Sequence, residues 1–84
     1  MTNQDLLNLH VNEITKIKFS VLLSIARSEE PLTYTFIDSD KEYQIEVFFN
    51  SFSDEGLEMV VAMDSNWEGR FKSSDTTRVV TIRP

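Results

Sequence analysis

Apolar side chains near the N-terminus recur at the spacing of one helix face. At 100° per residue they fall within less than half a turn of a helical wheel. The members of this stripe are Leu6, Leu7, Val11, Ile14, Ile17, Val21, Leu22 and Ile25. Thr2 or Asn3 can cap such a helix, and Asp5 suits its first turn. Pro31 lies just past its end. The pattern predicts one long helix whose apolar stripe faces a core.

Part of the same stretch also carries the pattern of a strand. Ile17, Phe19, Val21, Leu23 and Ile25 alternate with a partly polar set. Residues 14–25 can therefore be read as helix or as strand. We favour the helix because the stripe is longer than an ordinary strand. A break near Asn12 or Lys18 stays open as an alternative.

After Pro31 the pattern changes to a period of two residues, which is typical of strands with one buried face. β-Branched and aromatic residues are frequent in these segments, as they are in sheets. Two short polar clusters, residues 38–41 and 53–56, have turn chemistry. The predicted strands are residues 32–36, 42–50, 57–64 and 76–83, and a loop from Ser65 to about Asp75 precedes the last one.

Strands joined by such short turns are antiparallel, because a parallel crossover needs a dozen or more residues. The sequence therefore predicts an α+β fold, in which one long N-terminal helix packs on a four-stranded antiparallel meander sheet (α-β-β-β-β). Residues 1–84 are expected to form a single compact domain. The uncovered sheet face is expected to show Ile37, Phe48, Val60, Ala62 and Val79 among threonines and carboxylates. That face is too apolar to meet only water.

Composition excludes several classes of protein. A chain of 84 residues suffices for one small core. It contains no cysteine, which excludes disulfides, cysteine nucleophiles and zinc–cysteine sites. No apolar stretch approaches the roughly 20 residues that span a bilayer, and the first residues do not resemble a secretory signal. We expect a cytoplasmic protein without a membrane partner.

Few residues offer catalytic chemistry. His10 is the one histidine and falls within the apolar stripe, so we expect a structural role for it. The two glycines are too far apart for a phosphate-binding loop. Asp38, Asp40 and Glu42 are spaced like calcium ligands. A calcium loop needs glycine at its sixth position, however, and Tyr43 stands there. We expect no enzyme activity, no metal and no cofactor.

Charge is the most informative functional signal. Fourteen acidic and eight basic residues give a net charge of −6, which argues against direct nucleic-acid binding. Residues 38–68 hold nine carboxylates and one cation, a net −8 segment. Such a field steers a basic partner onto the protein. We therefore predict an inhibitor, immunity or adaptor protein that occupies a basic surface on another protein, with mimicry of nucleic-acid charge as one form of this function.

The predicted binding residues lie on the uncovered sheet face and around the one tryptophan. They are Glu42, Glu46, Phe48, Glu58, Val60, Asp64, Trp67 and Arg70. Because Trp and Arg are enriched at binding hot spots, the segment around Trp67 is either a binding anchor or a lid on the core. Trp67 and Arg70 could instead line a small ligand or catalytic pocket, although no constellation requires one.

Self-association is the alternative function. Phe19, Leu23 and Ala26 form a second apolar strip on the predicted helix, unless the loop of residues 65–75 covers it. Either this strip or the uncovered sheet face could pair with a second copy. The alternative prediction is a homodimerising structural or assembly domain without catalytic activity.

Overall fold

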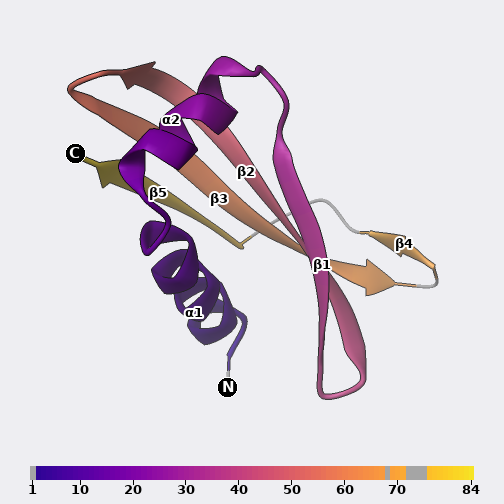
Figure 1. The fold of residues 1–84 in the computed structure, drawn as a ribbon. Helices are drawn as coiled ribbons and strands as arrows, with labels where there is room; N and C mark the ends of the chain where they lie inside the picture. Colours follow the sequence, from indigo (N-terminus) through magenta and orange to yellow (C-terminus); the bar gives the residue numbers. More distant parts are fainter. Residues whose placement is uncertain (1, 68, 72–75) are drawn as a thin grey trace.

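A computed structural model describes residues 2–67, 69–71 and 76–84, with the backbone alone for residues 67, 70 and 71. Two helices precede the strands of one sheet (Figure 1). They are α1 (Asn3–Thr15) and α2 (Phe19–Arg27), followed by β1 (Leu32–Asp38), β2 (Lys41–Ser53), β3 (Gly56–Trp67), β4 (Arg70–Phe71) and β5 (Thr76–Ile82). The strands β1, β2, β3 and β5 form an antiparallel meander in this order, and β4 pairs only with the end of β3. The predicted α+β class and meander sheet are confirmed.

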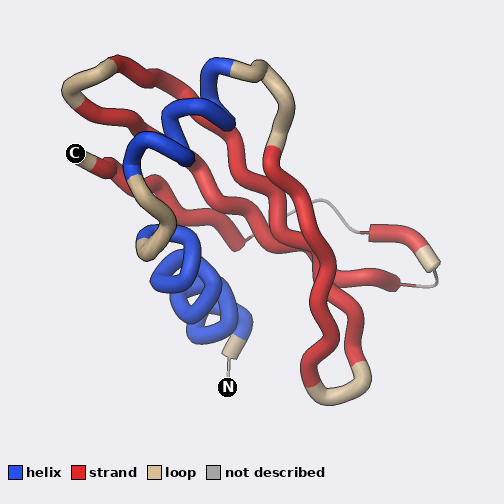
Figure 2. Tube along the Cα trace, viewed as in Figure 1, coloured by secondary structure: helices blue, strands red, loops and turns tan. Residues whose placement is uncertain are grey.

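The N-terminal segment forms two short helices where the sequence predicts one long helix. α1 begins with a capping box, in which the Asp5 N–H donates to the Thr2 hydroxyl at 3.1 Å and the Thr2 N–H donates to the Asp5 carboxylate at 3.0 Å. Lys18 has an extended backbone (ψ 139°), which ends the helical ladder between α1 and α2. The reason is packing, because α1 contacts β5 and β3 whereas α2 contacts β2 (Figure 2). A straight helix over residues 3–27, about 37 Å long, could not follow both parts of the twisted sheet.

The break also turns α2 relative to the predicted stripe. Leu23 and Ala26 are buried, and Phe19 packs on the core. Val21, which the stripe places in the core, is 46% exposed. The prediction of a second apolar strip was therefore wrong, because these residues face the sheet and are not a free docking surface.

The strands alternate as predicted, and their turns set the register. Ser39–Asp40 closes the β1–β2 hairpin with positive φ at both residues (51° and 64°), which is the type I′ turn that suits the twist of a hairpin. β2 runs past the predicted end at Asn50, because a bulge between Phe49 and Ser51 shifts the pairing. β3 extends to Trp67, and β4 lies within the predicted loop.

The core lies between the helices and one face of the sheet, called the inner face. Its buried members are Leu6, Leu7, Val11, Ile14, Leu22, Tyr43, Ile45, Val47, Leu57, Met59, Val61 and Met63. The opposite face, called the outer face, is covered by neither α1 nor α2 (Figure 1). Neither of these two helices has the length and apolar character needed to cross a membrane.

Candidate docking face

The outer face carries a row of apolar side chains across three neighbouring strands. Phe48 of β2 is opposite Val60 of β3, and Val60 is opposite Val79 of β5. Because paired residues project to the same side of a sheet, the three side chains are adjacent. Phe48 is 45% exposed, Val79 is 60% exposed, and Val60 is half-buried. We call Phe48, Val60 and Val79 the apolar row.

Carboxylates flank the apolar row on both sides. Glu46 and Glu58 each stand two positions before a member of the row, on β2 and β3 respectively. Because β2 and β3 are antiparallel, the two carboxylates lie on opposite sides of the row. Glu42 and Asp64 lie further along the face, on the side of Glu46. No outward position of β1, β2, β5 or residues 56–66 of β3 is Lys or Arg.

Two asparagine amides orient carboxylates on this face. Asn50 Nδ2 donates to Glu58 Oε1 at 3.3 Å, and Asn66 Nδ2 donates to Glu42 Oε2 at 3.1 Å. An amide is a neutral donor, so these hydrogen bonds orient each carboxylate without pairing it with a cation. The outer face therefore combines an apolar centre with an oriented acidic rim.

Most of the predicted binding residues share this face. Glu42, Glu46, Phe48, Glu58, Val60 and Asp64 all project outward, as the alternation predicts. Trp67 and Arg70 pair with each other through their backbones, across the turn between β3 and β4. Their side chains lie outside the described residues, so the choice between anchor and lid stays a prediction. The part that each residue takes in binding also stays a prediction.

Val79 belongs to the apolar row, although the sequence alone does not single it out for binding. Its alternation places it on the outer face, but only the β3–β5 pairing brings it opposite Val60. The predicted loop before β5 hides this register from a sequence-based argument. Ile37, on β1, is the most exposed large apolar residue of the face at 75%.

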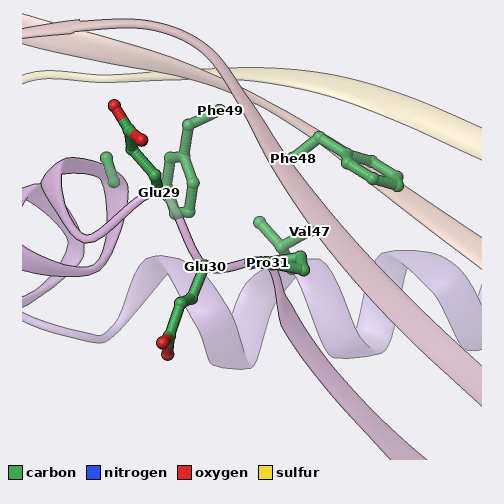
Figure 3. A pocket seen from close by; sticks show the side chains of 7 residues that line it. Glu29, Glu30, Pro31, Val47, Phe48 and Phe49 are labelled. Atoms are coloured by element: carbon green, nitrogen blue, oxygen red, sulfur yellow. The ribbon is translucent and has the colours of Figure 1, made fainter.

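A cavity of about 310 Å³ lies beside the apolar row, where β1 leaves β2 (Figure 3). It is lined by Ala26, Glu29, Glu30, Pro31, Val47, Phe48 and Phe49. Figure 3 shows that the side chains of Glu29 and Glu30 point in opposite directions. Of its lining residues only Phe48 belongs to the outer face, because Val47 and Ala26 are buried on the side of the core.

His10 joins α1 to β1 in an aromatic cluster. Its Nδ1 lies 2.8 Å from Tyr34 Oη, its ring stacks on Phe36 at 4.0 Å, and Phe36 stacks on Tyr43 at 5.2 Å. Burial lowers the pKa of His10, partly opposed by Glu13, and burial raises the pKa of Tyr34. The lowered pKa favours the neutral imidazole, and the tautomer of this ring decides which of the two groups donates the hydrogen bond. These are the contacts of a packing residue.

The described residues offer no cluster of three or more His, Asp or Glu side chains that could hold a metal ion. Comparisons of the chain with protein-family models, with curated proteins and with solved structures find no significant match. The case for a function therefore rests on the geometry of the outer face.

Proposed function

We propose that this chain is a small acidic protein-binding module whose outer face occupies a basic surface on another protein. The observation that carries the proposal is the apolar row with carboxylates on both sides, on a sheet face that α1 and α2 leave uncovered. An inhibitor, immunity or adaptor protein works by occupying a surface and needs no catalytic group.

The apolar row supplies the centre of the contact. Full burial of a large apolar side chain contributes about 1.5–3 kcal/mol. Covering the exposed fractions of Phe48 and Val79 therefore contributes roughly 2–3 kcal/mol together. Even a millimolar dissociation constant requires about 4 kcal/mol. The apolar row alone therefore contributes too little free energy for binding, and the groups around it must contribute the rest.

The carboxylates contribute further binding free energy when the partner presents Lys or Arg at its rim. Complementary charge steers the encounter and excludes wrong partners. Each ion pair at an exposed rim contributes only about 0–1 kcal/mol and is screened by salt. We therefore expect binding whose association rate falls as the salt concentration rises.

Nucleic-acid charge mimicry is a narrower form of the proposal. Glu42, Asp64 and Glu46 follow one another along the face in steps of two residues, about 6.6 Å each. A DNA strand carries one phosphate per roughly 3.4 Å of helix axis. The carboxylates are thus about half as dense as the phosphates of one strand. This face therefore suits a partner that also contacts the apolar row better than a partner that recognises only the charge pattern of a nucleic acid.

Two charge-neutralising variants with equal net charge test the acidic rim. The outer-face variant is E42Q/E46Q/E58Q, and the control variant, changed elsewhere on the surface, is E13Q/D54N/E55Q. Each tagged protein captures partners from host-cell extract at low and moderate salt, and the captured proteins are identified by mass spectrometry and purified. We expect a basic partner whose Kd rises at least tenfold with the outer-face variant and less than twofold with the control.

A second pair of variants tests the apolar row. Phe48→Ser removes the aromatic member of the row, whereas Phe52→Ser removes a comparably exposed phenylalanine beyond the bulge. We expect tenfold weaker binding for the first variant and no change for the second. Equal effects within either pair of variants, or a wild-type protein that captures no partner, would contradict the proposal.

A further inference from the structure

β1 is an edge of the sheet, paired only with β2 among the described strands (Figure 1). The two-residue turn closes the hairpin at the pair Asp38–Lys41, which in such hairpins exchanges both backbone hydrogen bonds. Hydrogen-bonded pairs alternate with non-bonded pairs along an antiparallel ladder. The backbone groups of Thr33, Thr35 and Ile37 therefore point away from β2, toward solvent.

β1 lacks most of the devices by which proteins usually protect an edge strand, and its one charged residue, Asp38, stands at its end. Its residues, Leu32–Asp38, contain no proline, no lysine and no bulge. At the other edge, β5 carries Arg78, which donates to Asn8 Oδ1 of α1 at 3.1 Å, and α1 packs beside this strand. One edge strand therefore carries a cation that a helix holds in place, whereas the described residues of β1 carry none.

We propose that a second copy of this chain pairs with β1, antiparallel, about a two-fold axis at Thr35. The side chains next to this residue are alike on its two sides, whereas those at the two ends of the strand, Leu32 and Asp38, are not. Tyr34 and Phe36 flank it on the inner side, and Thr33 and Ile37 follow on the outer side. The axis places Tyr34 of one copy opposite Phe36 of the other. Aromatic pairs and Thr–Thr pairs are favourable across strands, so this strand is complementary to itself, as a two-fold contact requires.

The exposed side chains of β1 are consistent with a second copy of the chain at this edge. Ile37 is 75% exposed, and Tyr34 and Phe36 remain half-buried although they face the inner side. Their neighbours on β2, Tyr43 and Ile45, are buried. A second β1 covers the aromatic side chains and adds two backbone hydrogen bonds for each hydrogen-bonded pair.

The outer face is a much poorer contact between copies. Its carboxylates would meet carboxylates of the same kind, and like charges across an interface oppose association. Pairing through β1 avoids this contact, because it sets the two outer faces side by side in one continuous sheet. The pairing does not depend on the proposed function and leaves Phe48 and Val79 open to a partner.

Single cysteines test this register, because the chain has none of its own. In the proposed pair the two Cα atoms of residue 35 lie about 5.5 Å apart, within disulfide range. The two Cα atoms of residue 33 are offset by four residues and lie about 14 Å apart. T35C is therefore expected to form a covalent dimer under mild oxidation, and its matched control T33C is not. A mixture of T33C and I37C is expected to form the covalent heterodimer.

Analytical ultracentrifugation of the wild type and of T35K supplies a second measurement. Thr35 is exposed, so T35K should keep the fold, as far-UV circular dichroism verifies, while two lysines meet at the axis. We expect the dimer Kd to rise at least tenfold. Added salt should lower the dimer Kd, because it screens the repulsion between two chains of charge −6. It should raise the Kd for a basic partner, because it screens that attraction. The two proposals can therefore fail separately. A wild type that stays monomeric at millimolar concentration, or T33C that oxidises as readily as T35C, would overturn this pairing.

Discussion

Alanine substitution of Leu23 and of Val21, one at a time, tests how α2 is turned on the sheet. The one-helix pattern places Val21 in the core and Leu23 outside it. In the structure Leu23 is 7% exposed and Val21 is 46% exposed. Replacing a buried leucine by alanine costs about 2–5 kcal/mol of stability. Because Leu23 lies at the margin of the core, we expect a loss of about 2–3 kcal/mol.

Val21→Ala should change the free energy of unfolding far less. Removing two carbons that are about half-buried costs roughly 0.8 kcal/mol, and the better helix propensity of alanine returns up to about 0.6 kcal/mol. The expected net loss is below about 0.5 kcal/mol. In a domain of this size, a difference of about 2 kcal/mol between the variants corresponds to roughly 8–16 °C in Tm.

Thermal and urea unfolding, followed by far-UV circular dichroism at one protein concentration, measure both variants. Equal m values keep the comparison valid, because they show that the same surface is exposed on unfolding. If Val21→Ala loses as much stability as Leu23→Ala, or more, the rotation of α2 is wrong, and with it the break at residues 16–18.

Three further changes probe local features. Burial lowers the pKa of His10 in the folded state. The contribution of neutral His10 to the free energy of unfolding is therefore fully present above the ordinary pKa of 6.5. It is lost as the pH falls from there toward the lowered pKa, and below that pKa it changes no further. Urea titrations at about pH 7 and about pH 5 should show that His10→Phe removes this part of the pH dependence. If the pH dependence is unchanged in this variant, other groups cause it. Ser39→Asn combined with Asp40→Gly should stabilise the protein by about 1 kcal/mol, because Asn-Gly accepts positive φ more readily, and a lower Tm would refute this account of the turn. Thr2→Ala should lose about 1 kcal/mol in urea titration through the missing N-cap, whereas Asn3→Ala should be nearly neutral; equal losses would place the cap elsewhere.

The sheet could be predicted from the sequence because its signals are local. Apolar and polar residues alternate strictly from Tyr43 to Val47, the inward residues of 57–63 (Leu57, Met59, Val61 and Met63) keep the same period of two, and short polar clusters separate these runs. A period of two residues assigns every side chain to a face once one residue is placed. For this reason the sequence alone collects Glu46, Phe48 and Val60 on one surface.

The sequence leaves a break near Lys18 open as an alternative, but its pattern does not require one. Residues 16–18 contain neither glycine nor proline, and Ile17 continues the apolar stripe across the break. The break is a tertiary effect, because α1 and α2 pack on different strands. The bulge at Asn50 is hidden for a similar reason. Phe48 and Phe49 are consecutive apolar residues, so the period does not show where the extra residue lies.

The hydrogen bond between Asn8 and Arg78 joins α1 to β5 across 70 positions of the chain. Ribosomes add about 5–20 residues per second, so about 60 residues and some 3–12 s separate the synthesis of α1 from that of β5. During this interval β1, β2 and β3 can already pair through their short turns. The apolar side of α1, by contrast, cannot pack completely until β5, the last strand that it contacts, has been synthesised. Packing of α1 is therefore a late event in biosynthesis, and a nascent chain exposes this helix to chaperones for seconds before its partner strand exists.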